Sequence, residues 1–224
     1  MDNKPIPSEI NNKSSQFIEN NYVLMTYDKI AKNFSDTRFK VWDTAAKFIS
    51  SFPKDSNIVE IGCGNGKNMM IRDDVNFFGC DISEEFVRIC QSRGLNVIKG
   101  NNLKLPYDNN KFDFTLSIAV IHHLFSYENR LNSIKELVRI TKPNGKIFIE
   151  VWAYEQGPES KFDFREQDLL VPFKDKVTRE VLGERYYHMF REDELQELIN
   201  EIDNVEILEK FYEKGNWGII IQKI

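Results

Sequence analysis

The stretch Val59-Glu60-Ile61-Gly62-Cys63-Gly64-Asn65-Gly66-Lys67 decides the fold of this chain. Its first residues complete an apolar run over 58–61, which predicts a buried strand, and three alternating glycines end that strand. Glycine adopts positive φ readily and lets a second backbone or a ligand approach where a Cβ would collide. Ligands of open α/β sheets bind at the carboxyl ends of the strands. The stretch therefore predicts a ligand cradle made of a strand, a glycine turn and the start of a helix.

The composition is that of an ordinary globular protein. The 224 residues are 41% hydrophobic and 29% charged, and no apolar run approaches the roughly 18 residues of a transmembrane helix. The polar amino terminus lacks a signal-peptide pattern, and Cys63, Cys80 and Cys90 lack metal-like spacing. We therefore expect a cytoplasmic protein with reduced thiols and no metal site. The net charge of -5 does not indicate nucleic-acid binding, although a basic patch can lie on an acidic body.

Strand and helix patterns alternate from the glycine stretch onward. Apolar and helical periodicities predict strands over 58–61, 75–80, 97–98, 112–120 and 146–152, and helices over 84–92 and 129–140. This alternation implies right-handed crossovers and a parallel sheet. A helix over 192–202 and a hairpin of strands 205–212 and 217–222 complete the chain. The predicted fold class is α/β, a Rossmann-like, mainly parallel seven-stranded sheet that ends in a C-terminal antiparallel hairpin.

Two segments stand outside this alternation. Helical patterns over 16–34 and 42–52 precede the first strand, which predicts a helical amino-terminal cap over residues 15–52. Residues 153–188 combine Gly157, Pro158 and Pro172 with scattered aromatics and charges, which indicates an inserted loop or lid after the fifth strand. We expect residues 1–14 to be disordered and residues 15–224 to form a single domain.

The spacing of the glycines narrows the choice of ligand. A nicotinamide fingerprint requires a sixth-position glycine, and that position, counted from Gly62, holds Lys67, which we interpret as a solvated helix residue. The alternation of Gly62, Gly64 and Gly66 instead resembles the first motif of class I S-adenosylmethionine-dependent methyltransferases. That resemblance implies the class I methyltransferase fold and a cofactor whose methionine end lies across the glycines.

Asp81 supports the same cofactor. It ends the second strand at nearly the ~20-residue spacing at which an acidic residue accepts hydrogen bonds from ribose hydroxyls. The alternative is capping of the next helix, which Ser83 can also perform. In the class, an Asp near the end of strand three often holds the adenine amino group, and Asn101 occupies that place here. The expected cofactor-binding residues are Glu60, Gly62, Gly64, Gly66, Asp81, Ile82, Asn101, Asn102, Leu103 and Ser117.

Several strings outside the cofactor motifs point to the acceptor. They are SIAVIHH (117–123), YDKIAKNFSDTRFKVW (27–42), EQDLLVPF (166–173), RYYHMFREDEL (185–195) and FYEKGNW (211–217). Together they resemble the eukaryotic tRNA wobble-uridine carboxymethyl methyltransferases, and the resemblance covers almost everything from Tyr22 onward. That family methylates the carboxylate of 5-carboxymethyluridine in the anticodon loop. The resemblance implies Arg38 and His123 as catalytic residues and Trp152, Arg185, Tyr186 and His188 as further substrate contacts.

The implied chemistry suits these residue types. A carboxylate is ionised at neutral pH and is itself the nucleophile, so no general base is required. A bidentate arginine suits carboxylate binding, which makes Arg38 a candidate clamp, although a salt bridge or a phosphate contact would also explain it. His123 would position the uracil or the carboxyl group, and the roles of these two residues are not separated by the sequence. We expect its neighbour His122 to be a buried, hydrogen-bonded core residue.

The partners follow from the same resemblance. Basic residues on the cap and in the insertion predict a rim for a tRNA anticodon loop, and interleaved aromatics are suited to stacking on bases. Family members work with a small zinc-binding activator protein, and the short strand 97–98 at an expected sheet edge is a candidate docking site for it. Two other functions remain open on the sequence alone: a small-molecule O- or N-methyltransferase, and a non-catalytic binding module of the same fold.

Overall fold

The body of the protein is a seven-stranded sheet in the order β4-β3-β2-β5-β6-β10-β9. The computed structural model describes residues 3–158 and 160–224. The sheet strands are β2 (Asn57–Ile61), β3 (Asn76–Asp81), β4 (Asn96–Lys99), β5 (Phe112–Ile118), β6 (Thr141–Trp152), β9 (Val205–Glu213) and β10 (Asn216–Lys223). The first five are parallel, and β10 runs antiparallel to both β6 and β9. This topology confirms the predicted fold class.

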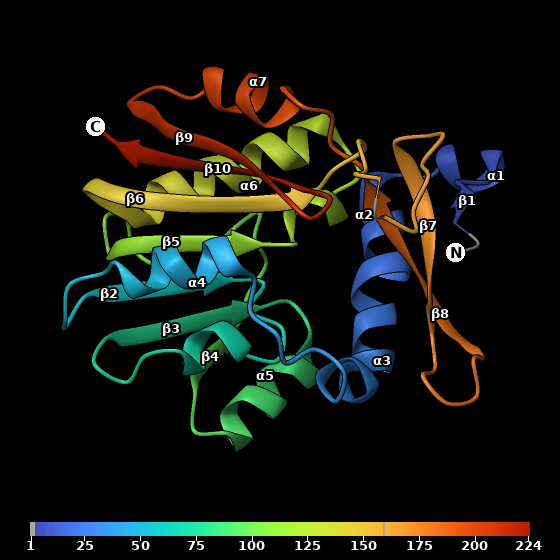
Figure 1. Cartoon of the computed structure of the whole chain (residues 1–224), viewed down its shortest axis with the longest axis horizontal. Helices are drawn as coiled ribbons and strands as arrows, with labels where there is room; N and C mark the ends of the chain where they lie inside the picture. The colour runs from blue at the N-terminus through green and yellow to red at the C-terminus, as the bar shows by residue number, and fades with distance from the viewer. Residues whose placement is uncertain (1–2, 159) are drawn as a thin grey trace.

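Helices cover both faces of the sheet, which explains why its central strands are apolar throughout. On β6, Ile147 and Ile149 face the core formed with α6 (Tyr127–Ile140) and α7 (Glu194–Asn200). Phe148 points to the opposite face, where α4 (Asp43–Ser50) packs with Phe48 and Ile49. The helix α5 (Glu84–Ser92) covers the β3–β4 end of the sheet. Figure 1 shows α4 in front of the sheet and α6 behind it.

The amino-terminal cap is shorter than expected. A continuous helical segment consists of α2 (Ser15–Glu19), the π-helical turn Asn20–Leu24 and α3 (Met25–Ser35). The second predicted cap helix is α4, and it packs on the sheet through Ala45, Phe48 and Ile49. Its apolar stripe is therefore part of the main core, and only the helical segment ending at Ser35 lies beyond the strand ends.

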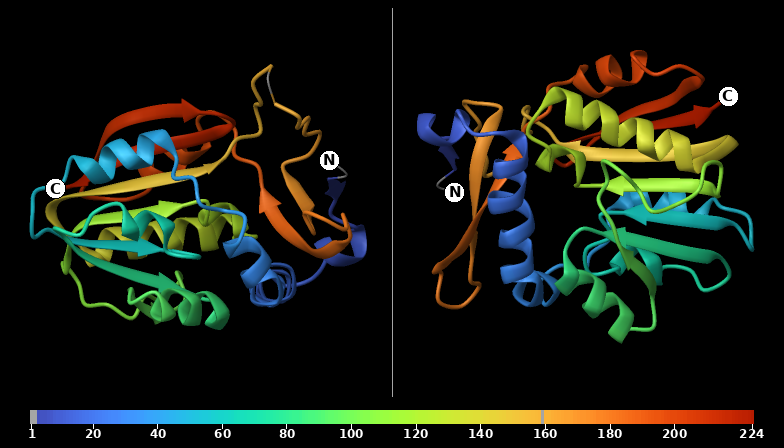
Figure 2. Two further views of the ribbon diagram at one scale, coloured as in Figure 1. Left: turned by 60° about the horizontal axis from the view of Figure 1, so that its bottom comes forward. Right: turned by 180° about the vertical axis from the view of Figure 1, so that it is seen from behind.

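The insertion is a β-hairpin and not an irregular loop. β7 (Asp168–Lys174) and β8 (Val181–His188) pair antiparallel, and β1 (Lys4–Pro5) adds a third, two-residue strand. Successive residues of β7 point to opposite faces of the hairpin, and each face has its own small core. Leu169 and Val171 belong to one core and Leu170 to the other. The sequence contains this alternation, but Pro172 interrupts it, and a proline within such a run argues against a strand. In both views of Figure 2 the hairpin stands apart from the main sheet.

The start of the chain also differs from the prediction of disorder over 1–14. β1 and the one-turn helix α1 (Ser8–Asn11) are ordered because Ile6 and Ile10 pack against the cluster that contains Leu170 and Tyr186. Residues 1 and 2 lie outside the described residues. Strand β1 joins residues 4 and 5 to the hairpin, which comes more than 150 residues later, as the pairing of Lys4 with Leu170 shows.

The glycine turn leads into a 3₁₀ helix, Lys67–Met70, where the sequence predicted the start of a regular helix. A single short turn of this kind carries little of the dipole that a long helix would direct at a ligand. Binding at this turn must therefore depend on the glycine backbone and on neighbouring side chains. No helix among residues 3–158 and 160–224 is long and apolar enough to cross a membrane.

Candidate active site

A cavity of about 1920 Å³ opens at the carboxyl ends of the parallel strands. In Figure 1 the arrows of β3 and β5 point toward it, and α3 with the β7–β8 hairpin forms its far side. Its walls comprise the glycine turn, the ends of β3 and β5, the loop after α3, and the hairpin. Pockets for single drug-sized ligands are ~300–1,000 Å³, so this cavity has room for two reactants side by side.

The three glycines of the decisive stretch have different roles. Gly62, Gly64 and Gly66 all have positive φ, of 72°, 52° and 73°. A Cβ on Gly64 would meet no atom within 4 Å, so its backbone faces open space in the cavity. A Cβ on Gly66 would lie 2.3 Å from Cδ1 of Leu95, and Gly66 does not line the cavity. Gly64 is therefore a cradle residue, whereas Gly66 packs against Leu95, and the cavity lining does not support the predicted contact of Gly66 with a cofactor.

Asp81 lies at the end of β3, beside the glycine turn. Its Oδ2 accepts a hydrogen bond of 2.8 Å from the amide of Gly64, and its Oδ1 accepts one of 2.9 Å from the amide of Ser83. Burial raises the pKa of Asp81 to about 6, against the effect of these two donors. A carboxylate has about four acceptor positions, so two remain for hydroxyl donors in the cavity. The capping role considered for Asp81 belongs to Ser83, whose hydroxyl accepts from the amide of Phe86.

Glu60 is a second buried acid in the donor half of the cavity. Its Oε1 accepts a hydrogen bond of 2.5 Å from Nδ2 of Asn68, and its Oε2 is buried without a partner among the described residues. Burial raises its pKa to about 7. Glu60 lines the cavity as predicted, and its free oxygen is a hydrogen-bonding position next to the glycines.

The loop after β4 contributes the predicted side of the cavity. Asn101, Asn102 and Leu103 of this loop line it, as does Ile82, which directly follows β3. Oδ1 of Asn101 already accepts a hydrogen bond of 2.9 Å from the amide of Leu103, so its amide group is held in one orientation. A further acceptor position remains on that oxygen.

Ser117, which the sequence predicts as a cofactor-binding residue, does not line the cavity. Side chains of a strand alternate between faces, and on β5 the residues Leu116 and Ile118 face the α4 core. Ser117 therefore points to the other face, where its hydroxyl is buried without a partner among the described residues. The residues that follow it, Ile118, Ala119 and Val120, line the cavity instead.

His123 lies at the acceptor end of the cavity and is held from both ring nitrogens. Nδ1 is 2.7 Å from the carbonyl oxygen of Tyr186, which can only accept, so Nδ1 carries the proton. Nε2 is then an acceptor and receives a hydrogen bond of 2.8 Å from the hydroxyl of Tyr27. Burial lowers the pKa of His123 to about 3. The ring is consequently neutral, and its lone pair is already occupied.

His122, as expected, is a core residue. It is fully buried, its Nδ1 accepts from the amide of Trp152 at 3.1 Å, and its ring stacks on Tyr187 with centroids 4.8 Å apart. Burial lowers its pKa well below the ordinary value. The prediction for His122 is confirmed.

The hairpin strand β8 divides the RYYH string between two faces. Arg185 and Tyr187 line the cavity, while Tyr186 and His188 do not. Tyr186 packs with Ile18 and Leu170 behind the hairpin. Substrate contact by Tyr186 and His188 is therefore not supported, because strand alternation turns both side chains away from the cavity.

His188 instead connects the hairpin to the body. Its Nδ1 is 2.9 Å from Oδ1 of Asp168 on β7, and its Nε2 is 2.5 Å from Oε1 of Glu194 on α7. Burial opposes the charged form, but the two carboxylates outweigh it and raise the pKa of His188. Tyr186 donates to the same Asp168 oxygen. This group is a structural link between two parts of the fold.

Arg185 has a different environment from Arg38. It is 6% exposed, and its Nη1 donates to the hydroxyl of Tyr187 at 2.8 Å. Arg38 is exposed at the mouth of the cavity, with its guanidinium carbon 5.6 Å from the ring centre of Phe34. Asn65 of the glycine stretch donates to the carbonyl of Arg38 at 2.9 Å, which fixes the loop but leaves the side chain at the surface.

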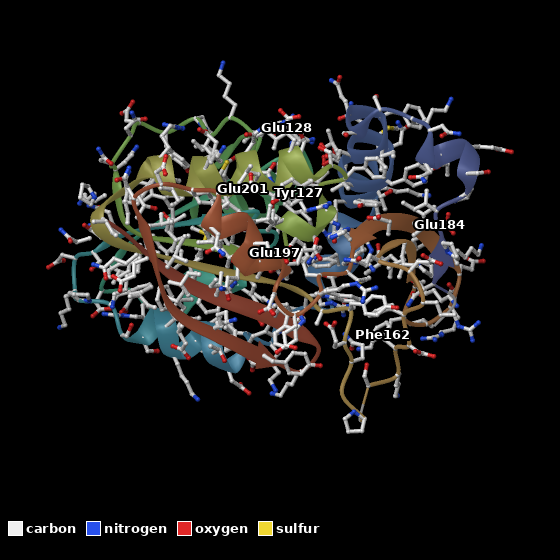
Figure 3. All side chains as sticks on the ribbon, turned by 90° about the horizontal axis from the view of Figure 1, so that it is seen from above. Tyr127, Glu128, Phe162, Glu184, Glu197 and Glu201 are labelled. Carbon is white, nitrogen blue, oxygen red and sulfur yellow. The ribbon has the colours of Figure 1, made fainter. Side chains whose placement is uncertain are left out.

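Aromatic side chains line the acceptor end of the cavity. Trp152 lies at the end of β6, with its ring 4.8 Å from that of Tyr187 and 5.3 Å from that of Phe162. Figure 3 labels Phe162 on the inserted segment between the body and the hairpin. Trp152 and Phe162 both line the cavity, so the predicted place of Trp152 beside the substrate is consistent with the geometry.

Sequence reasoning missed two residues of this site. Lys67 is half-buried and lines the cavity, and its ammonium donates to the carbonyl of Lys40 at 2.9 Å, so it is not the solvated residue that the sequence indicates. Tyr27 belongs to the helical stripe of the cap and to one of the strings that resemble the family, but the sequence assigns it no role of its own. Its hydroxyl is a functional group because α3 places it against His123, which lies 96 residues away in sequence.

Comparisons with known proteins bear on the family and the fold. A family model described as a methyltransferase domain matches residues 59–149. Solved structures share the fold, among them a SAM dependent methyltransferase from Aquifex aeolicus, which is 20% identical with a TM-score of 0.61 and is covered over 98% of its length by 88% of this chain. A complex of the Trm112 methyltransferase activator with a putative methyltransferase from Haloferax volcanii also matches, at 17% identity, a TM-score of 0.61 and coverage of 88% of this chain and 95% of that one.

Several relatives are more similar in sequence, and proteins of three different organisms among them carry the name tRNA (carboxymethyluridine(34)-5-O)-methyltransferase. The protein of Schizosaccharomyces pombe is 40% identical, over 92% of this chain and 97% of that protein. The Xenopus tropicalis protein is 32% identical over 97% of this chain but only 43% of its own length, and the Arabidopsis thaliana protein is 44% identical over 66% of this chain and 37% of its own length. The chain thus spans less than half of two of these relatives and nearly all of the third, and it belongs to the tRNA (carboxymethyluridine(34)-5-O)-methyltransferase family.

Proposed function

We propose that this protein methylates the carboxylate of 5-carboxymethyluridine at the wobble position of tRNA anticodons, with S-adenosylmethionine as the donor, to give the methyl ester. The observation that supports this most strongly is that a donor site and an acceptor site lie in the same cavity. A glycine cradle with a buried acid lies on one side of it, and a buried arginine among neutral hydrogen-bonding groups lies on the other. One relative that carries this activity in its name, the Schizosaccharomyces pombe protein, matches 92% of this chain.

The donor half fits S-adenosylmethionine. The open space above Gly64 admits a ligand backbone, and Asp81 retains two acceptor positions for ribose hydroxyls. Asn101 and Leu103 would hold the adenine side, and Glu60 would contribute its free oxygen near the glycines. When bound, the donor supplies a sulfonium methyl group, whose carbon–sulfur bonding pair stays on sulfur while a carboxylate oxygen forms the new bond to carbon.

The acceptor half fits a reaction that transfers no proton. The nucleophile is an ionised carboxylate, so the side chains have only to orient it and exclude water. His123 is neutral, and its one lone pair already accepts from Tyr27, so it is not available as a general base. We propose that His123 instead acts as a positioning residue, because it fixes the hydroxyl of Tyr27 at the cavity wall.

Basic residues around the cavity mouth support an RNA substrate. The positively charged side chains that line it on the loop after α3, in the insertion and at the hairpin tip are Arg38, Lys40, Lys161, Lys174, Lys176 and Arg179. Such a rim suits phosphates on either side of a nucleotide turned into the cavity. Trp152 and Phe162 provide aromatic faces on which its base can stack.

We further propose that a small zinc-binding activator docks on the free edge of β4. β4 is the last strand on its side of the sheet, and Ile98 is 38% exposed there. An unpaired edge strand is a template for β-augmentation. A distant structural neighbour was solved in complex with the Trm112 methyltransferase activator. We place the protein in the cytoplasm, where its three free cysteines would remain reduced.

The function is tested with purified protein, donor and tRNA that carries carboxymethyluridine, with and without the activator. Nucleoside mass spectrometry should show conversion of carboxymethyluridine to its methyl ester, and mild alkali should reverse it. The matched control is an Asp81→Ala variant, which should lose donor binding and conversion together. Methylation of small carboxylic acids or amines without tRNA conversion would identify a small-molecule enzyme, and absence of donor binding would identify a non-catalytic module.

A further inference from the structure

We infer that Arg185 holds the carboxylate of the acceptor and makes the enzyme selective for an anionic group over uncharged counterparts of the same shape. This inference rests on the proposed function and assigns within it a role that the sequence suggested for Arg38. The residues that carry it are Arg185 and the side chains in direct contact with it: Tyr27, Tyr187 and Phe173.

Arg185 is a buried cation without an anion. Its side chain is part of a residue that is only 6% exposed, and no acidic side chain within residues 3–158 and 160–224 forms an ion pair with it. Buried charges in proteins are ordinarily paired with a counterion. The adjacent acid, Glu184, points away and pairs with Lys4 at 3.6 Å. The charge of Arg185 therefore awaits a partner from outside the chain.

Its hydrogen-bonding capacity is also largely unused. The guanidinium group has five N–H donors. Nη1 donates to Tyr187 at 2.8 Å and lies 3.5 Å from the hydroxyl of Tyr27. Nε is buried and has no acceptor among the described residues. A planar carboxylate is the group whose geometry matches a guanidinium fork with free parallel donors.

The surroundings keep this cation fixed without neutralising it. The guanidinium carbon lies 5.8 Å, 5.4 Å and 5.2 Å from the ring centres of Tyr27, Phe173 and Tyr187, so aromatic faces partly stabilise the charge. Tyr27 is in turn held by His123, whose Nδ1 is bonded to the backbone of β8 itself. The chain from His123 through Tyr27 to Arg185 is thus anchored at both ends in regular structure, as a preorganised site requires.

Arg38 does not share these properties. It lies on an exposed loop at the cavity mouth, where water can solvate its charge without a ligand. We therefore assign Arg38 to the RNA phosphates at the rim and Arg185 to the carboxylate inside. The same cavity would also hold the carboxylate of the donor's methionine end, so the experiment must separate an acceptor anion from a donor anion.

The test compares Arg185→Met, Arg185→Lys, Arg38→Met and, as a control outside the cavity, Arg88→Met, whose side chain is 63% exposed on α5. Methyl transfer is measured on carboxymethyluridine tRNA. Discrimination is measured as the ratio of the binding affinity for that tRNA to the binding affinity for tRNA with the uncharged carbamoylmethyluridine. Donor-site integrity is measured as calorimetric affinity for S-adenosylhomocysteine, which retains the methionine carboxylate.

Arg185→Met is expected to lose about 100-fold or more in transfer and to abolish discrimination, while its affinity for S-adenosylhomocysteine stays near wild type. Arg185→Lys should recover part of the discrimination, because it keeps a charge but loses the fork. Arg38→Met should weaken tRNA binding and keep the discrimination ratio.

The inference would be overturned if Arg185→Met kept its discrimination between the two tRNAs. It would also be overturned if Arg185→Met lost S-adenosylhomocysteine affinity and methyl transfer in the same proportion, and Arg185→Lys restored both the affinity and the transfer. If Arg185→Met does not fold, the ratio measured for Arg185→Lys decides, since a purely structural arginine would leave it unchanged. Failure of the proposed function is a separate result, because the wild-type protein would then form no methyl ester at all. In that case, equal binding of carboxymethyl and carbamoylmethyl tRNA to wild-type protein also contradicts the inference.

Discussion

Tyr27 donates a hydrogen bond of 2.8 Å to Nε2 of His123, although the two residues lie 96 positions apart in the chain. Tyr27 comes from the helical cap, and His123 lies in the 3₁₀ turn that follows β5. The cap is therefore attached to the active site through a functional group and not only through apolar packing. The carbonyl of Tyr186 fixes the proton of this histidine on Nδ1, so Nε2 is the acceptor of the bond from Tyr27.

The first prediction concerns this pair and pH. Because burial lowers the pKa of His123 to about 3, the ring stays neutral from about pH 5 upward, and its titration should not appear in the pH dependence of kcat. A general base with an ordinary histidine pKa would instead give an acidic limb near pH 6.5. Tyr27→Phe should lower kcat about tenfold with the flat profile retained, in line with loss of one hydrogen bond. A limb near pH 6.5 that disappears in His123→Asn would contradict this assignment.

The second prediction uses two glycines as a matched pair. Gly64→Ala and Gly66→Ala both place a Cβ on a residue with positive φ, so each should lose roughly 1 kcal/mol of stability from backbone strain. Only Gly66→Ala also collides with Leu95, at 2.3 Å, which should add about 1–3 kcal/mol of overpacking. Gly64→Ala should instead reduce affinity for S-adenosylhomocysteine, because its methyl group enters the cradle.

Thermal unfolding and calorimetry on the two variants check this division. Gly66→Ala should have the lower Tm, and Gly64→Ala should have the lower donor affinity at a temperature where both are folded. Equal effects of the two substitutions on donor affinity would mean that Gly66 contacts the donor after all.

These glycines show which parts of the site can be predicted from the sequence. The strand, the turn and Asp81 are close in sequence and follow a local pattern, so their meeting at one sheet edge was predictable from topology. Which glycine faces a ligand was not predictable, because the answer depends on Leu95, which reaches Gly66 only after α5 has packed.

The acceptor half shows the opposite case. Arg185, Tyr187 and Tyr27 meet because β8 pairs with β7 and α3 packs against the hairpin, and Tyr27 and Arg185 are 158 positions apart. Pattern alone could have separated Arg185 and Tyr187 from Tyr186 and His188, since residues two apart on a strand share a face. That inference requires the segment to be recognised as a strand, whereas its prolines and glycines favour a loop.

The third prediction concerns the link between the hairpin and the body. His188 lies between Asp168 and Glu194, and these carboxylates outweigh its burial and raise its pKa. A raised folded-state pKa stabilises the fold fully below the unfolded value of about 6.5, and the contribution is lost as pH rises through the folded-state pKa. The difference in Tm between wild type and His188→Gln should therefore be largest near pH 6 and shrink toward pH 9.

Asp168 and Glu194 do not interfere in this window, because their pKa values are lowered and they titrate at more acidic pH. A matched control is Tyr127→Phe, which removes a bond to Glu201 between α6 and α7 that Figure 3 locates on the body. Its Tm difference should stay constant over the same range. A His188→Gln difference that grows with pH would show that the histidine is neutral in the folded protein.

The last prediction concerns the acid of the donor cradle. Burial raises the pKa of Asp81 to about 6, so in the donor-free protein this group is ionised above that pH and protonated below it. Only the ionised form offers both oxygens as acceptors to ribose hydroxyls. Affinity for S-adenosylhomocysteine should thus be constant above about pH 7 and fall by up to tenfold per pH unit below pH 6. Asp81→Asn should bind weakly at every pH, with no such slope, whereas the exposed control Asp203→Asn should retain the wild-type profile. If Asp81→Asn kept the same pH dependence of affinity, the titrating group would be Glu60, the other buried acid that lines the same half of the cavity.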